Sequence, residues 1–200
     1  MSVAAVVPVK DLAGTKSRLT PILDPAGRAG LTIYMMGRVI CALLEAGIED
    51  TCVVSPDRLV LQKAGEKGAE VLHQESRGLN PALEEGRRWA LGRGASALLV
   101  LPADLPLLEA EDVRAVISCG KEEPSVVISS DATNAGTNAL LLRPPDLFPF
   151  AFGPGSFGKH RRTAEESNIP MTVCERTHLA FDLDTKEDFA RLRSLEGLLP

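Results

Sequence analysis

Short apolar runs alternate with helical repeats of apolar residues through the first half of the chain. Residues 3–9 (VAAVVPV) are all apolar, the pattern of a strand buried on both faces of a parallel sheet. From Leu31 to Leu44 apolar residues recur at intervals of three and four, and Gly47 supplies a stop signal. This spacing predicts a helix of about four turns.

The same alternation continues as far as residue 119. It predicts strands at 51–54, 69–73 and 97–101, and helices at 59–67, 81–91 and 109–119. Strands that alternate with helices of this length indicate βαβ units with right-handed crossovers. We therefore expect the first half to form a doubly wound parallel sheet.

The second half follows a different pattern. Its apolar runs predict strands at 126–129, 137–142, 171–174 and 178–182, and prolines break up the stretch between 144 and 154. A closing helix is predicted at 187–195, with Thr185 as its N-cap. Because the chain has no repeat or linker, we expect residues 1–200 to form a single α/β domain, with helices on both faces of a mostly parallel mixed sheet.

Charge and composition narrow the classes of partner. The net charge of -5 argues against binding to nucleic acid, which needs clustered Lys and Arg. No apolar run approaches the 18 or more residues of a membrane span, and residues 1–9 lack the basic start of a signal peptide. We therefore expect a cytoplasmic protein that binds no membrane; nothing in the sequence indicates an oligomeric state.

The spacing of cysteine and histidine residues argues against a zinc site. The four cysteines include no C-x-x-C pair, and the three histidines show no H-x-x-x-H spacing. Any metal in this protein should therefore have oxygen ligands.

The loop that follows the first predicted strand is a candidate phosphate site. An open α/β sheet places its ligand crevice at the carboxyl ends of its strands. Gly14 would let a phosphate approach the backbone, and Lys10, Lys16 and Arg18 could neutralise a triphosphate. A solvated basic loop is the alternative, because neither G-x-x-x-x-G-K-[ST] nor G-x-G-x-x-G is present.

Three aspartates are candidate metal ligands. Asp104 follows the strand predicted at 97–101, where it could hold Mg²⁺ on substrate phosphates. Asp182 and Asp184 stand at i and i+2 of an extended segment, so their carboxylates leave the same face and repel each other unless a cation lies between them. As alternatives, Asp104 is a turn residue and Asp184 joins Thr185 in capping the last helix.

Two loops that contain glycine, 133–140 and 152–160, offer hydroxyls and amides to an anion. The second loop is expected to open a helix, whose first N–H groups attract a phosphate or carboxylate. An ordinary turn with Ser156 as N-cap is an equal alternative. Asn80 could contact a base or ribose, but capping of the helix at 81–91, with Pro81 at its first position, explains it equally well.

Taken in order, the motifs of the chain match those of one family. They are K-x-L-x-x-x-K-x-R-L, G-L-N-P-A-L, P-A-D-L-P-L, G-T-N-A-L, F-G-P-G-S-F and F-D-L-D-T. The sequence resembles the 2-phospho-L-lactate guanylyltransferases of coenzyme F420 biosynthesis, which include the bacterial phosphoenolpyruvate guanylyltransferases. The resemblance covers nearly the whole chain.

This resemblance implies a fold similar to that of the molybdenum-cofactor nucleotidyltransferases, with GTP and Mg²⁺ as partners and pyrophosphate as the leaving group. It implies that Asp104, Asp182 and Asp184 bind the metal and that Thr137, Gly153 and Ser156 hold the phosphorylated acid. The phosphate of the acid is already a nucleophile, so no base is required. Lys16, Arg18 and Asp104 are then the expected catalytic residues, and the expected contacts to the nucleotide are Lys10, Gly14, Lys16, Asn80 and Asp104.

Other functions stay open at this point. The acceptor could be phospholactate, phosphoenolpyruvate or phosphoglycerate, which differ by a few atoms. A cytidylyltransferase or a glycosyltransferase that uses a sugar nucleotide could share the fold. A nucleotide-binding regulator without catalysis is the alternative from another class, although three retained aspartates count against it.

Overall fold

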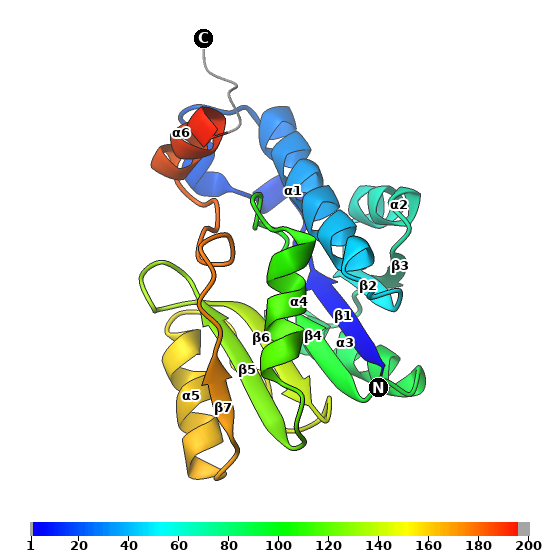
Figure 1. The fold of residues 1–200 in the computed structure, drawn as a ribbon. Helices are drawn as coiled ribbons and strands as arrows, with labels where there is room; N and C mark the ends of the chain where they lie inside the picture. Colours follow the sequence, from blue (N-terminus) through cyan, green and yellow to red (C-terminus); the bar gives the residue numbers. More distant parts are fainter. Residues whose placement is uncertain (1, 196–200) are drawn as a thin grey trace.

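Seven strands form one sheet, in the order β3-β2-β1-β4-β6-β5-β7, in the computed structural model, which describes residues 2–195 (Figure 1). The strands are β1 (Val3–Pro8), β2 (Thr51–Ser55), β3 (Glu70–His73), β4 (Ala97–Val100), β5 (Ser125–Ser130), β6 (Thr137–Arg143) and β7 (Met171–Val173). The strands β1 to β4 are parallel to one another, whereas β6 is antiparallel to both β4 and β5. The predicted fold class, a mostly parallel mixed sheet, is confirmed.

Helices cover both faces of this sheet (Figure 1). One face packs against α1 (Pro25–Glu45), α2 (Arg58–Glu66) and α4 (Ala110–Cys119), and the other against α3 (Leu79–Gly92) and α5 (Ser156–Glu166). In β1, Ala5 and Val7 belong to the first core, and Ala4 and Val6 belong to the second. Burial on both faces is why this strand is apolar at every position.

The helix α1 begins six residues before the predicted start at Leu31. Asp24 caps it by accepting a hydrogen bond from the Gly27 N–H at 2.6 Å, and Pro25 occupies the first turn. The small and polar residues of this first turn carry no apolar repeat, so periodicity could not find it. Within residues 2–195, α1 is the one helix long and apolar enough to cross a membrane, and half of its most apolar window is buried in the domain. Arg28 and Arg38 interrupt the apolar residues of this helix, so the expectation that no apolar run approaches such a length holds for unbroken runs and fails only for helix length and mean hydropathy.

The strand predicted at 178–182 does not exist. The chain makes a single turn there, in which the Ala180 N–H donates to the Arg176 carbonyl at 3.0 Å. The Leu179 carbonyl accepts from the side chain of Asn138 at 2.8 Å. A side chain at the start of β6 therefore takes the place of a neighbouring strand as hydrogen-bond partner.

The last helix, α6 (Lys186–Leu195), has the predicted cap. The Thr185 hydroxyl accepts from the Asp188 N–H at 3.2 Å, and the Asp188 carboxylate accepts from the Thr185 N–H at 2.8 Å. This reciprocal pair satisfies two of the N–H groups that a helix start leaves without partners.

The order of the strands places a crevice beside β1. The strands β2 and β3 lie on one side of β1, and β4 lies on the other side. The connection after β1 therefore runs to one side of the sheet and the later strands lie on the opposite side, which leaves a crevice between the carboxyl ends of β1 and β4. Because β6 is antiparallel and Leu140 pairs with Val100, the first residues of β6 lie at this same edge. The segments after β1 and β4 therefore meet the start of β6.

At Gly86 the helix α3 packs closely against Val6 of β1. A Cβ at this position would lie 2.6 Å from Cγ1 of Val6, whereas a Cβ at Gly30 of α1 would meet no atom within 4 Å. Gly86→Ala should therefore lower the free energy of unfolding by about 1–3 kcal/mol, as overpacked cores do. Gly30→Ala, the control, should raise it by up to about 1 kcal/mol because alanine favours helices. Urea denaturation measures the free energy of unfolding of both variants. Equal changes in the two variants would mean that Val6 can move aside.

Candidate active site

The loop after β1 is held in place by contacts to α1. It forms two short 3₁₀ turns, Leu12–Gly14 and Ser17–Leu19. Between them the Thr15 hydroxyl shares a hydrogen bond with the Thr32 hydroxyl at 2.9 Å, and the Thr15 carbonyl accepts from Nε of Arg28 at 3.3 Å. The next residue, Lys16, has a left-handed backbone with φ of 46°. Anchoring at Thr15 fixes the direction in which Lys16 leaves the loop.

The Lys16 ammonium joins two parts of the chain that are far apart in sequence. Its Nζ lies 2.8 Å from Oδ2 of Asp104 and 2.9 Å from Oδ1 of Asp184, and its side chain is only 7% exposed. Burial by itself would lower the pKa of Lys16, but the two carboxylates outweigh burial and raise the pKa above its usual value. The lysine therefore stays charged at neutral pH.

Arg18 lies at the edge of the same cluster. Its Nη1 is 3.8 Å from Oδ2 of Asp184, and its side chain is 73% exposed. An ion pair with so exposed a side chain contributes little to the stability of the fold. Arg18 is therefore free to change partner at little cost.

The three predicted metal ligands come together, but their electrostatic environments differ. Burial raises the pKa of Asp182, and the negative charges of Asp104 and Asp184 raise it further, against a hydrogen bond from Asn138. For Asp184, burial would also raise the pKa, but the positive charges of Lys16, Arg18 and Lys10 lower it below the usual value. Asp182 is thus the carboxylate that lacks a cation.

Backbone contacts bring these aspartates together. The Leu183 N–H donates to the Asp104 carbonyl at 3.0 Å, which ties the segment after residue 180 to the loop after β4. The Asp182 Oδ1 accepts from Nδ2 of Asn138 at 3.2 Å. Oxygens of the three carboxylates do not all lie within 4.8 Å of one another, and Lys16 bridges two of them. The arrangement offers oxygen ligands to a hard cation beside the buried positive charge of Lys16.

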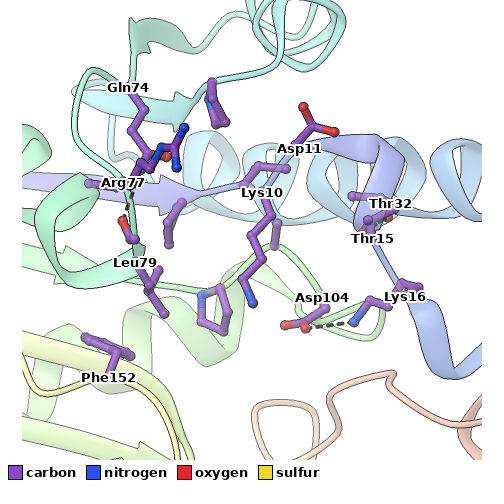
Figure 2. A pocket seen from close by; sticks show the side chains of 18 of the residues that line it. Lys10, Asp11, Thr15, Lys16, Thr32, Gln74, Arg77, Leu79, Asp104 and Phe152 are labelled. Carbon is purple, nitrogen blue, oxygen red and sulfur yellow. Dashed lines mark hydrogen bonds and ion pairs between the residues drawn. The ribbon is translucent and has the colours of Figure 1, made fainter.

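A pocket of about 730 Å³ extends from this cluster along the carboxyl ends of β1 and β4 (Figure 2). This volume is typical of sites for small molecules and cofactors. Figure 2 shows Lys10 and Lys16 reaching from the loop after β1 toward Asp104. The predicted residues that line the pocket are Lys10, Gly14, Lys16, Arg18, Asp104 and Asp184.

The far end of the pocket is a loop that the sequence analysis missed. Residues 74–79 line it, between β3 and α3. Glu85 of α3 is 7% exposed and accepts from the N–H groups of Glu75 at 3.1 Å and Ser76 at 2.8 Å. The sequence carries no signal for this loop, because the local pattern around Glu85 is the same as that of a solvated glutamate on a helix.

The side chain of Asn80 neither caps α3 nor lines the large pocket, and it binds the backbone of Phe152 instead. The helix α3 starts at Leu79 with Gly78 as its N-cap, so capping by Asn80 was a wrong interpretation. Its Oδ1 accepts from the Phe152 N–H at 2.8 Å, and its Nδ2 donates to the Phe152 carbonyl at 3.1 Å. The amide therefore joins α3 to the second glycine loop, and Asn80 is not among the residues that line the large pocket.

The three predicted acid-binding residues lie on two adjoining loops. Thr137 begins β6 and Ser156 begins α5, whose N-cap is Gly155, so the alternative that Ser156 is the N-cap was wrong. The Phe157 N–H donates to the Ala135 carbonyl at 3.2 Å, which holds the two loops together. Gly153 has a φ of 122°, a conformation that side chains rarely allow.

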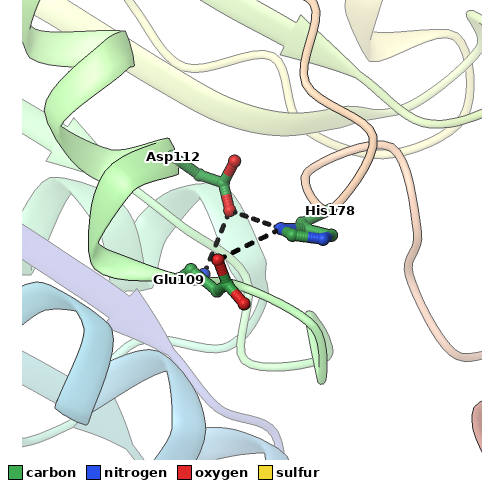
Figure 3. Close-up of side chains that lie close together, drawn as sticks. All are labelled: Glu109, Asp112 and His178. Atoms are coloured by element: carbon green, nitrogen blue, oxygen red, sulfur yellow. Dashed lines mark hydrogen bonds and ion pairs between the residues drawn. The ribbon is translucent and has the colours of Figure 1, made fainter. Parts of the chain in front are cut away.

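A second acidic cluster supports the segment that carries Asp182 and Asp184 (Figure 3). Asp112 of α4 is 1% exposed and lies 2.9 Å from Nδ1 of His178 and 2.8 Å from Nε of Arg176. Oxygens of Asp112 and Glu109 lie close enough to His178 that the three could hold a metal ion. Asp112 also accepts from the Glu109 N–H at 3.1 Å, so its carboxylate is already fully engaged in joining α4 to this segment.

The fold and the position of the site define the class of protein. Solved nucleotidyltransferases superpose on nearly the whole chain: one from Methanothermobacter gives a TM-score of 0.76 with 16% identity and covers 97% of both chains. CMP:2-keto-3-deoxy-manno-octonic acid synthetase, bound to CTP, gives 0.63 with 14% identity and covers 99% of both chains. The fold is that of the α/β nucleotidyltransferases.

The chain belongs to the family described as guanylyl transferase CofC-like, whose model matches residues 3–194. It is 58% identical to phosphoenolpyruvate guanylyltransferase of Rubrobacter xylanophilus over 198 residues, 99% of this chain and 97% of the relative. It is 32% identical to 3-phospho-D-glycerate guanylyltransferase of Colwellia psychrerythraea over 193 residues, 96% and 91% of the two chains. The predicted family is confirmed, and the protein is an enzyme of the guanylyltransferase type.

Asp182 and Asp184 should have opposite effects on the stability of the metal-free protein. The pKa of Asp182 is higher in the folded protein than its ordinary value of 3.8. The free energy of unfolding therefore falls as pH rises from 3.8 through the pKa of the folded protein, and the ionised group is destabilising at pH 7. The pKa of Asp184 is lower in the folded protein than 3.8. Its ionised form therefore stabilises the fold above pH 3.8, and this stabilisation is lost as pH falls through the pKa of the folded protein. Asp182→Asn should therefore raise the Tm at pH 7, and Asp184→Asn should lower it.

Both changes should be on the order of 1 kcal/mol or less, which corresponds to about 2–4 °C, because these groups are partly solvated. Calorimetry in the presence of a chelator measures them. Shifts in the same direction would contradict the charge distribution described here.

Proposed function

We propose that this enzyme transfers GMP from GTP to a small phosphorylated acid, phosphoenolpyruvate, and releases pyrophosphate. The observation that carries the proposal is the Lys16 ammonium, which joins Asp104 and Asp184 at the mouth of the 730 Å³ pocket. It places one buried positive charge and a carboxylate cluster where a nucleotidyltransferase needs to hold a triphosphate. The relative with 58% identity, named for phosphoenolpyruvate, supports this choice of acid.

The loop after β1 is proposed to bind the triphosphate. A Cβ at Gly14 would meet no protein atom within 4 Å, so space in front of this backbone is open to phosphates. Lys10, Lys16 and Arg18 bring three positive charges to the same side of the pocket. Lys16 and Arg18 would stabilise the charge that develops at the α-phosphate, and the base would extend toward residues 74–79.

Asp104, Asp182 and Asp184 are proposed to hold Mg²⁺. The site fits such a cation, because the carboxylates of Asp104 and Asp184 meet at Lys16, and burial together with the negative charges of these two aspartates raises the pKa of Asp182. When bound, the metal would neutralise phosphate charge and polarise the α-phosphate. Lys16 would then exchange a carboxylate for a phosphate oxygen as its partner.

The acid is proposed to bind where the starts of β6 and α5 meet, at Thr137, Gly153 and Ser156. Ser156 is 2% exposed and begins α5, so its hydroxyl lies beside the first N–H groups of that helix. Hydroxyl and N–H donors at the start of a helix can bind the oxygens of an anion. The phosphate of the acid would attack the α-phosphate directly, so the protein contributes alignment and charge neutralisation.

This activity assigns the enzyme to coenzyme F420 biosynthesis, in accordance with its family. We place it in the cytoplasm with GTP and the acid as its partners, without a nucleic-acid or membrane partner. The net charge of -5 supports the exclusion of a nucleic-acid partner.

Release of pyrophosphate tests the function. GTP with phosphoenolpyruvate should give the highest kcat/KM, and 2-phospho-L-lactate and 3-phospho-D-glycerate should give lower values. ATP, CTP and UTP should be poor substrates with every acid. Equal turnover with CTP would overturn the guanylyltransferase assignment, and a preference for 3-phospho-D-glycerate would overturn the choice of acid.

Asp104→Asn tests the metal site while preserving the shape of the side chain. It should lower kcat by roughly 10²–10³, as loss of one electrostatic stabiliser does. The double variant with Asp182→Asn should be little worse than the poorer single variant, because residues that act as a unit are not additive. Asp146→Asn, at an exposed position, is the control and should keep full activity. Full activity of Asp104→Asn at limiting Mg²⁺ would show that Asp104 is a turn residue.

Ser156→Ala should raise the KM for the acid by roughly tenfold and leave the KM for GTP nearly unchanged, because the hydroxyl would contact only the acid. Ser167→Ala, at the exposed C-terminal end of the same helix, provides the control and should change neither value. Steady-state kinetics with one substrate varied at a time separates the two constants. The reverse pattern would place this loop at the nucleotide.

A further inference from the structure

His160 of α5 is completely buried and uses both ring nitrogens. Its Nε2 lies 3.0 Å from the Ala151 backbone nitrogen, and its Nδ1 lies 3.1 Å from Oγ1 of Thr137. The ring thus connects the loop before α5 to the first residue of β6. Neither the metal site nor the pocket includes it among the residues described above.

These two contacts determine the tautomer of the ring. A backbone N–H can only donate, so Nε2 of His160 must accept from Ala151 and carry no hydrogen. A neutral imidazole has a single N–H, which must then be on Nδ1. Burial lowers the pKa of His160 to about 4, with a smaller contribution from the nearby charge of Lys159, so the ring is neutral at pH 7.

Aromatic neighbours hold the ring in this orientation. Phe148 stacks on it with a centroid distance of 6.1 Å, and Phe152 meets it edge to face at 5.0 Å. Phe152 also lines the large pocket, and its backbone is fixed by Asn80. A 180° rotation of the ring would put carbon atoms where its nitrogens lie, so both hydrogen bonds would be lost.

The tautomer in turn sets the role of the Thr137 hydroxyl. Since Nδ1–H of His160 donates, Oγ1 of Thr137 accepts. The hydroxyl hydrogen of Thr137 then has no acceptor among residues 2–195. It is available to an oxygen atom outside the protein, and the bond from the Phe157 N–H to the Ala135 carbonyl holds the start of α5, with Ser156, against the loop that precedes Thr137.

We propose that His160 is a positioning residue that makes the Thr137 hydroxyl a committed hydrogen-bond donor to an anionic oxygen of the phosphorylated acid. This proposal rests on the function proposed above and adds how the protein fixes the polarity of the acid site. In this arrangement Thr137 and Ser156 each offer a hydroxyl donor to the anion. The chain of bonds runs from the Ala151 N–H through the ring to Thr137 and ends at the acid.

NMR of the protein labelled with ¹⁵N in histidine tests the first step without any turnover. Long-range ¹H–¹⁵N correlations distinguish the tautomers, and loss of a signal in His160→Phe assigns it among His73, His160 and His178. We expect His160 to be neutral and protonated at Nδ1 from pH 6 to pH 8. A hydrogen on Nε2, or a charged ring at pH 7, would overturn the proposal even if the enzyme turned over normally.

Two pairs of variants test the second step. Thr137→Val removes the hydroxyl and should raise the KM for the acid about tenfold, whereas Thr137→Ser keeps it and should stay within about twofold of the unmodified enzyme. His160→Asn can place its amide N–H near the position of Nδ1, and His160→Gln can reach only the position of Nε2. His160→Gln should therefore raise the KM for the acid more than His160→Asn does, with the KM for GTP unchanged.

The combination of variants separates positioning from simple support of the fold. If His160 acts through Thr137, His160→Gln added to Thr137→Val should change the KM for the acid no further. A further multiplicative increase, or an equal increase in the KM for GTP, would overturn the proposal. Should the His160 variants fail to fold, the Thr137 pair decides, since equal KM values for the valine and serine variants would also overturn it. Absence of pyrophosphate release by the unmodified enzyme with every acid would refute the proposed function itself.

Discussion

The buried ammonium of Lys16 is the interaction on which the site depends. A lysine that is almost fully removed from water is unfavourable unless carboxylates surround it. The two carboxylates come from the loop after β4 and from the segment before α6, so the charge balance is met only when three distant parts of the chain are in place. The cluster therefore requires the sheet, the anchoring of Thr15 and the docking of the last segment all at once.

Much of the fold could be predicted from the sequence because its signals are local. The apolar run of β1 reflects burial on both faces, and the reciprocal cap of α6 lies within four residues. The segment 178–182 has a strand-like composition but hydrogen-bonds to the Asn138 side chain, and no local pattern could indicate that contact. The first turn of α1 was missed because it lacks apolar residues.

For the site, sequence and family motifs together identified the residues around Lys16, and the sequence could not identify the residues that support them. Glu85, Asp112 and His160 are single buried polar residues, and each binds a partner that lies between 9 and 66 positions away. Such a residue has no periodicity or spacing that distinguishes it from a solvated one. Only the packing of α3, α4 and α5 against the sheet shows which groups they bind.

The mixed charge of the cluster has a thermodynamic consequence for the order in which ligands associate. A cation that arrives alone meets the Lys16 ammonium, and a polyphosphate that arrives alone meets three carboxylates. The two ligands together cancel both repulsions, so each raises the affinity for the other by the same factor. In the proposed reaction, the charge distribution of this cleft favours entry of a neutralised complex over entry of either ion alone.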